Sequence, residues 1–205
     1  MIVSLSAWKK SGKDHAAELL IKNLGFKRLA FADVLKDMVA EQYGIDRKSL
    51  DDQNLKEKAI LSLPVDPKDK FSEMVTNFMS REFAKGEDGR LYWTPRALAI
   101  LEGSVKRSVN STYWVSRALS KMQKGDRAVI ADMRYRSEAA QIKEFADKSG
   151  IKSLVVRINR FDESPSTDPS ERDMDNYGSF DHIIENKGTI EEFEDKVLRM
   201  VKDIL

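Results

Sequence analysis

The sequence predicts an α/β fold in three layers, with a central five-stranded parallel sheet and helices on both faces. An apolar run at residues 2–6 precedes a short loop and a helical pattern at 13–24. A second apolar run at 127–132 is followed by a helical pattern at 137–148 and a third run at 153–158. This order of strand, helix and strand favours parallel pairing with right-handed crossovers.

The first part of the chain continues this pattern. The first helix stops at Gly25, residues 27–31 predict a second short strand, and residues 33–43 predict a helix that ends at Gly44. The polar stretch 45–69 contains two prolines, and we expect it to be a helical excursion outside the sheet.

The middle of the chain predicts helices. Apolar residues at helical spacing predict an amphipathic helix over 70–85, and a turn is expected at 86–89. Thr94 is a candidate cap for a helix that Pro95 opens and that continues to Val109. A further helix is predicted over 111–124.

The last part returns to the sheet. Residues 159–180 are polar and lack an apolar period, which is typical of a lid-like functional loop. Residues 182–184 predict the last strand, and Thr189 with Glu192 forms a capping box for a terminal helix through Leu205.

Composition indicates one domain with one core. The 205 residues include 35 Lys and Arg against 34 Asp and Glu, and a net charge of +1 gives no global reason to expect a polyanionic partner. The absence of cysteine excludes disulfides and thiolate zinc sites, and no apolar run approaches membrane-spanning length. We divide the domain into a core (1–44 and 126–205), a helical region (about 45–125) and a lid (about 159–180).

The loop before the first helix predicts a phosphate-binding site. Ser11, Gly12 and Lys13 stand between a strand and a helix, where loop N–H groups and the helix dipole attract an anion and the lysine covers it. Ala7 stands where the usual pattern has its first glycine, and Asp14 where it has Ser or Thr. The alternative is an ordinary loop with Asp14 as a favourable first-turn acid.

Two acids are candidate metal ligands. Asp132 ends an apolar strand, and Asp14 offers a second hard oxygen ligand for Mg²⁺. The alternative for Asp132 is a cap at the end of the strand. Because ligands bind at the carboxyl ends of parallel strands, we expect Lys13, Asp14, Asp132 and Arg134 at one edge of the sheet.

Further cations are candidates for neutralising phosphate charge, although each alone could be a solvated surface residue. They are Lys36, Arg96, Arg107, Arg157 and Arg160.

The chain resembles the bacteriophage deoxynucleoside monophosphate kinases, relatives of the small P-loop nucleotide kinases, and also phosphomevalonate kinases of animal type. The motifs that carry the resemblance span nearly the whole chain: Ser11-Gly12-Lys13-Asp14, residues 31–37, Thr94-Pro95-Arg96-Ala97-Leu98, Tyr113-Trp114-Val115, Asp132-Met133-Arg134 with Glu138, Asp168-Pro169-Ser170-Glu171, residues 175–178 and residues 184–186. Residues 100–105 depart from the Leu-Gly-Thr-Asp common in the family.

The resemblance implies a P-loop kinase fold, ATP and Mg²⁺ as cofactors, and roles for individual residues. The implied catalytic residues are Lys13, Arg134 and Arg160, and the implied metal ligands are Asp14 and Asp132. The residues implied to bind the cofactor are Ser11, Gly12, Lys13, Asp14 and Arg157. The residues implied to bind the substrate are Asp33, Lys36, Arg96, Arg107 and Trp114. Lys36 and Arg96 are expected to hold the acceptor phosphate.

The expected activity is transfer of the γ-phosphoryl group of ATP to a deoxynucleoside monophosphate. The alternatives are another acceptor, either 5-hydroxymethyluracil in phage DNA or phosphomevalonate, and a nucleotide-binding module with little turnover. The near-zero net charge argues against a DNA acceptor. We expect a cytoplasmic protein, which would be in the host cytoplasm if it is phage-encoded. Its expected partner is a small-molecule deoxynucleotide substrate, with no membrane partner. The sequence leaves open whether the protein forms a homodimer.

Overall fold

A computed structural model describes residues 1–66, 83–161 and 172–204 of the chain. The chain divides into two compact units, one of residues 1–32 and 112–205 and the other of residues 33–111. The first unit contains the sheet and the second is a smaller helical unit with a hairpin.

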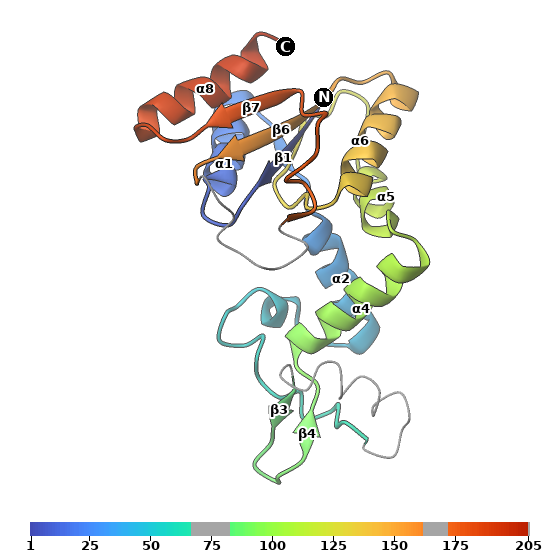
Figure 1. Cartoon of the computed structure of the whole chain (residues 1–205). Helices are drawn as coiled ribbons and strands as arrows, with labels where there is room; N and C mark the ends of the chain where they lie inside the picture. Colours follow the sequence, from blue (N-terminus) through green and yellow to red (C-terminus); the bar gives the residue numbers. More distant parts are fainter. Residues whose placement is uncertain (67–82, 162–171, 205) are drawn as a thin grey trace. The chain divides into compact units, whose positions relative to one another are not determined.

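The first unit is built on a five-stranded sheet in which every pairing is parallel (Figure 1). In spatial order its strands are β2 (Lys27–Arg28), β5 (Ala128–Ile130), β1 (Ile2–Ala7), β6 (Ser153–Asn159) and β7 (His182–Glu185). The predicted α/β fold class with a parallel five-stranded sheet is confirmed.

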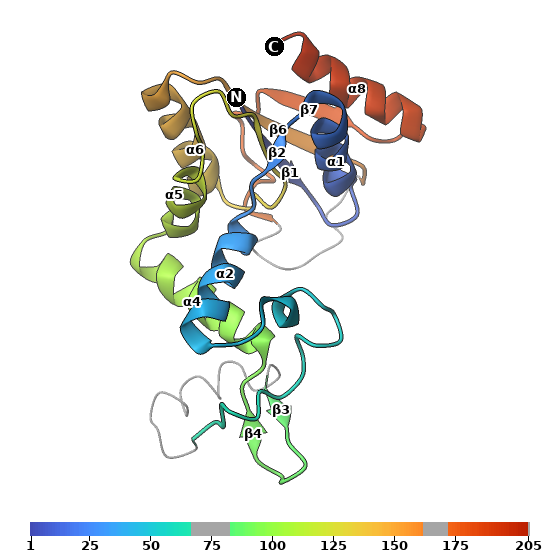
Figure 2. The same ribbon diagram turned by 180° about the vertical axis from the view of Figure 1, so that it is seen from behind.

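Helices cover both faces of this sheet. On one face lie α1 (Lys13–Leu24) and α8 (Ile190–Lys202), and on the other lie α5 (Tyr113–Leu119) and α6 (Arg136–Ser149), as Figures 1 and 2 show. α8 begins with the predicted capping box, because Thr189 Oγ1 accepts from Glu192 N–H and the Glu192 carboxylate accepts from Thr189 N–H.

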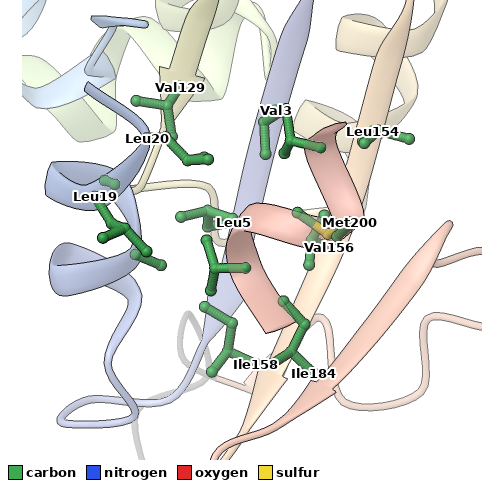
Figure 3. Packing of buried hydrophobic residues seen from close by; sticks show 14 of the residues in the cluster. Val3, Leu5, Leu19, Leu20, Val129, Leu154, Val156, Ile158, Ile184 and Met200 are labelled. Carbon is green, nitrogen blue, oxygen red and sulfur yellow. The ribbon is translucent and has the colours of Figure 1, made fainter. Parts of the chain in front are cut away.

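The core under α1 and α8 follows from strand alternation. Val3 and Leu5 of β1 point to this face with Val156 and Ile158 of β6, and they pack against Leu20 of α1 (Figure 3). The serines of β1, Ser4 and Ser6, alternate to the other face and are also buried. The central strand is therefore covered on both sides, which explains why residues of both its faces are buried.

The second unit contains most of α2 (Phe31–Tyr43), the 3₁₀ helix η1 (Arg47–Leu50), a hairpin of β3 (Ala84–Lys85) and β4 (Leu91–Tyr92), and α4 (Pro95–Val109). Thr94 Oγ1 accepts from Ala97 N–H, so the predicted cap and start of α4 are confirmed. Its core joins Val39, Leu50 and Leu98.

The excursion predicted over 45–69 does lie outside the five-stranded sheet in its described residues 45–66, but its expected helical character is wrong apart from one short 3₁₀ turn. These residues form only η1 followed by turns. Asp46 accepts from Lys48 N–H, and Asp52 accepts from Asn54 N–H and Leu55 N–H. These local bonds compete with helical bonds and stop the helix from forming.

The predicted helix over 70–85 lies mostly outside the described residues, and its last two residues are in β3 instead. The turn at 86–89 closes a hairpin, because Gly86 N–H donates to Arg90 O and Tyr92 pairs with Ala84. The predicted helix over 111–124 is shorter, ending at Leu119. The predicted strand over 27–31 ends at Arg28, because Phe31 already begins α2.

Candidate active site

The loop between β1 and α1 turns sharply at two residues in the left-handed region. Lys10 has φ +66° and Gly12, the residue before α1, has φ +97°. A Cβ on Gly12 would lie 2.7 Å from Asn186 Nδ2, and that amide donates to Ser11 O at 3.0 Å. Both the backbone angle and the close neighbour therefore require glycine here.

This loop has the geometry of an anion site. The first-turn N–H groups of α1 lie at the positive end of a 12-residue helix, and Lys13 is its first residue. Ser11 is fully buried, and its Oγ has no hydrogen-bond partner among the described residues. Ala7 is still in β1, opposite Ile158, so this position does not need a positive φ.

One cavity of about 350 Å³ adjoins this loop, and its lining includes four predicted site residues. Lys13 and Asp14 come from the start of α1, and Asp132 and Arg134 follow β5. β5 pairs directly with β1, so their carboxyl ends meet at one edge. The structure brings these four residues together, as expected for the carboxyl edge of a parallel sheet.

Two acids line this cavity, and they are the candidate magnesium ligands. The Lys13 Nζ and Asp14 Oδ2 atoms are 3.3 Å apart, and the Asp14 side chain is exposed. Asp132 Oδ2 accepts from Ala32 N–H near the start of α2, so Asp132 also has the capping role considered above. No group of three or more acidic or histidine side chains suited to a metal occurs in the described ranges. Two carboxylates suffice for Mg²⁺, because substrate phosphates and water supply its other ligands.

Arg157 contacts protein groups beside the loop. Its guanidinium is buried, donates to Ser6 Oγ at 3.1 Å and to Asp175 Oδ1 at 3.0 Å, and lies 4.9 Å from the ring centre of Trp8. Burial lowers the pKa of Arg157, and the Asp175 carboxylate opposes that shift. Arg157 thus supports the loop through Trp8; its predicted contact with a cofactor stays a prediction.

Arg160 approaches the loop from the end of β6. Its Nη1 donates to Lys10 O at 3.3 Å, so its guanidinium lies beside the loop backbone. The predicted lid at 159–180 falls partly on residues 162–171, which lie outside the described residues.

The predicted acceptor residues are mostly in the second unit, and three of them are in ion pairs. Lys36 Nζ is 2.7 Å from Asp51 Oδ1, Arg96 Nε is 2.5 Å from Glu57 Oε1, and Arg47 Nη2 is 3.4 Å from Asp33 Oδ1. Arg107 lies in the last turns of α4.

Trp114 belongs to the first unit and is 2 % exposed, with its ring edge-on to Tyr113. The protein encloses this ring, which favours a role in the core. Its predicted role in substrate binding is untested.

Two residues that contact the loop belong to motifs of the resemblance, but the sequence analysis gave neither of them a role. Asn186 follows β7 and donates to Ser11 O, and Asp175 accepts from Trp8 Nε1 at 2.6 Å. The position of Asn186 just after a strand at the carboxyl edge was a further signal for it. No local pattern predicts the contacts of Asp175, because Trp8 lies 167 residues away and Arg157 lies 18 residues away.

Among the described residues, no helix is both long enough and apolar enough to cross a bilayer.

Comparison with known proteins gives one relative in sequence and several in structure. No protein-family model matches the chain. It is 27% identical over 205 residues to an Acanthamoeba polyphaga mimivirus protein named "Putative deoxynucleotide monophosphate kinase", covering 98% of this chain and 96% of that one. Among solved structures, it aligns with the Mycobacterium tuberculosis APS kinase CysC in complex with AMPPNP and APS (TM-score 0.45, 11% identity, 98% of this chain and 96% of that one). It also aligns with TT1252 from Thermus thermophilus (TM-score 0.44, 14% identity, 100% and 98%).

Proposed function

We propose that this chain is a magnesium-dependent kinase that transfers the γ-phosphoryl group of ATP to the phosphate of a deoxynucleoside monophosphate. The observation that carries the proposal is the cavity shared by Lys13, Asp14, Asp132 and Arg134 beside a glycine-dependent loop at a helix N-terminus. Its volume of about 350 Å³ falls in the usual range for small-ligand sites.

The donor phosphates are assigned to the loop. An anion there meets the N–H groups of the first turn of α1 and the Lys13 ammonium, and the buried Ser11 hydroxyl offers a further donor. Within the described part of the chain, the Lys13 ammonium pairs with the exposed Asp14 carboxylate, so a polyphosphate with several charges can compete for it.

Asp14 and Asp132 are assigned to Mg²⁺. A bound magnesium ion would neutralise charge on the β- and γ-phosphates and orient them. Asp132 would hold the ion or its water while its Oδ2 keeps the bond from Ala32 N–H, which fixes the orientation of the carboxylate.

The transfer needs positioning and charge neutralisation more than a covalent intermediate. An oxygen of the acceptor phosphate bonds to the γ-phosphorus while the bond to the β–γ bridging oxygen breaks, which leaves ADP and a deoxynucleoside diphosphate. Lys13 and Arg134 stabilise the charge that accumulates on ADP and the transferring group. Lys36 and Arg96 of the second unit are assigned to the acceptor phosphate.

The choice of acceptor is supported by the viral relative, whose name specifies a deoxynucleotide monophosphate kinase and whose similarity extends over nearly the full chain. Near-zero net charge also favours a small acceptor over a duplex, because a duplex-binding face usually carries a basic excess.

The test is a screen with [γ-³²P]ATP and Mg²⁺ against the four deoxynucleoside monophosphates, phosphomevalonate and DNA that contains 5-hydroxymethyluracil. We expect label in a deoxynucleoside diphosphate, and none with the Lys13→Ala variant. Label only in phosphomevalonate or DNA would replace the acceptor, whereas ATP binding without any labelled acceptor would favour a nucleotide-binding module.

A further inference from the structure

Two acids from one segment contact the two cations assigned to the acceptor phosphate. Lys36 Nζ donates to Asp51 Oδ1 at 2.7 Å, and Arg96 Nε lies 2.5 Å from Glu57 Oε1. Asp51 follows η1 and Glu57 lies six positions later in the chain, so both acids belong to the segment between α2 and the hairpin. All four residues are in the unit of residues 33–111.

The segment is held in place without these two ion pairs. Arg96 N–H donates to Lys56 O at 3.0 Å, Ile60 N–H donates to Trp93 O at 2.9 Å, and Leu50 is buried against Val39. The backbone and the core therefore fix the segment, and the acidic side chains can change partners without unfolding it.

The side chains of both ion pairs are partly exposed, so an anion can reach the two cations, although the Nε atom of Arg96 itself is buried. These side chains are between about a quarter and a half exposed, 27% for Lys36 and 54% for Asp51, and 38% for Arg96 and 49% for Glu57. Ion pairs with this exposure contribute little stability because water screens them.

Asp51 has a second cationic partner when it leaves Lys36. Its other oxygen accepts from Arg47 Nη1, and Arg47 Nε donates to Asp37 Oδ1. The hydrogen bond from Lys36 lowers the pKa of Asp51, so this side chain is a carboxylate at neutral pH. Losing Lys36 to a ligand therefore does not leave Asp51 unpaired.

We propose that the Asp51 and Glu57 carboxylates are internal placeholders for the acceptor phosphate, which exchanges with them on Lys36 and Arg96. This inference rests on the proposed function, since it takes the same two cations as the acceptor site. The carboxylates keep the two cations ordered and neutralised in the free protein. A ligand that binds these cations must therefore supply the free energy that displaces the carboxylates.

The free energy needed to displace the carboxylates favours a phosphate monoester over anions of lower charge. Such a group carries a charge of about −1.5 to −2 at neutral pH and three acceptor oxygens, against one charge for each carboxylate. It can take a cation from a carboxylate, whereas an uncharged nucleoside cannot. The placeholders therefore lower the affinity of any anion that binds the two cations, and they favour a phosphate monoester over anions of single charge.

The experiment measures binding of 2′-deoxyribose 5-phosphate, without ATP, to full-length protein carrying Lys13→Ala so that the donor loop does not contribute. Asp51→Asn and Glu57→Gln should each tighten its dissociation constant by about 1.5- to 5-fold, the range for one exposed ion pair. Glu41→Gln is the matched control, because it removes an equal charge from exposed α2 surface, and it should bind like the Lys13→Ala parent. Unchanged or weaker binding by both folded placeholder variants would overturn the inference.

A second measurement does not depend on how the placeholder variants fold. In the Lys13→Ala protein, the ¹H–¹⁵N resonance of Arg96 Nε should shift as 2′-deoxyribose 5-phosphate is added, and deoxyribose at the same concentration should leave it in place. An Arg96 resonance that stays fixed at saturation would also overturn the inference. Neither measurement requires turnover, so both can be interpreted even if the acceptor screen finds no kinase activity. If the protein is an active kinase but the Asp51 and Glu57 variants bind like their parent, only this inference is rejected.

Discussion

Single residues at the loop have separable roles in geometry and charge. Gly12 is fixed by its φ of +97° and by the neighbouring Asn186 amide, so its role is conformational. Lys13 and Asp132 contribute charge at the cavity wall, and neither belongs to the apolar core. Substitutions at these two positions therefore test chemistry without a large loss of stability.

Lys13→Ala should lower the phosphoryl-transfer rate about 10²- to 10³-fold, the usual effect of removing one preorganised charge contact. The midpoint of thermal unfolding should stay near that of the wild type. Lys22→Ala, on the last turn of the same helix, is the control and should keep full activity. Near-wild-type turnover by folded Lys13→Ala would reject the loop assignment.

Asp132→Asn should reduce the rate mainly by weakening the magnesium site, because the amide keeps the shape and removes the charge. The Asn side-chain oxygen can still accept from Ala32 N–H, so the start of α2 is retained. Rate measured against Mg²⁺ concentration should show partial recovery at high Mg²⁺. Wild-type rates at low Mg²⁺ would leave Asp132 as a cap only.

At the level of elements, the sequence predicts best where side-chain periodicity and caps act locally. β1, α1, α4, β6 and α8 lie close to their predicted positions, because apolar alternation, helical spacing and cap residues act over a few residues. The helical character of the excursion at 45–66 was mispredicted, since Asp46 and Asp52 use their carboxylates on backbone N–H groups.

The candidate site was predicted only in part, because sequence patterns report on contacts between residues that are near one another in the chain. Lys13, Asp14, Asp132 and Arg134 could be placed together because strand ends in a parallel sheet share one edge. The contacts of Asn186 with Ser11 and of Asp175 with Trp8 join positions 175 and 167 residues apart. No local pattern encodes such pairs.

Thr189→Ala should lower the free energy of unfolding by about 1 kcal/mol, a typical cost for losing an N-cap side chain. The hydroxyl accepts from Glu192 N–H at 3.2 Å and completes the capping box of α8. Urea denaturation measures the change. Thr189→Ser keeps the hydroxyl and should recover most of the loss; equal destabilisation by both substitutions would contradict a capping role.

For the whole molecule, the two units divide the assigned roles. The donor residues Lys13, Asp14 and Asp132 are in the unit with the sheet, and the acceptor cations Lys36 and Arg96 are in the unit of residues 33–111. The sequence set the corresponding boundaries at 44/45 and 125/126, whereas the compact units divide at 32/33 and 111/112. The two assignments can therefore be tested with variants in different units.

Arg96→Ala should raise the acceptor KM or lower kcat while ATP affinity stays nearly unchanged. Arg96 lies at the first turn of α4, where the positive end of the helix dipole favours an anion and a guanidinium adds a planar donor fork. Steady-state kinetics with each substrate varied measures the split. Arg96→Lys should recover only part of the loss, because lysine keeps the charge without the fork.

A selective loss of ATP binding in Arg96→Ala, with the acceptor unaffected, would move this residue to the donor side. The same result would remove the strongest candidate from the acceptor site.

The packing of Trp8 makes the phosphate loop visible by fluorescence. Its indole donates to Asp175 at 2.6 Å and lies against the Arg157 guanidinium, within the same loop that ends at Gly12. Trp8 is one of three tryptophans in the chain, so comparison of emission from the wild type and Trp8→Phe isolates its signal. The protein thus carries a natural optical probe with which the proposed binding of nucleotide at the loop can be timed without a label.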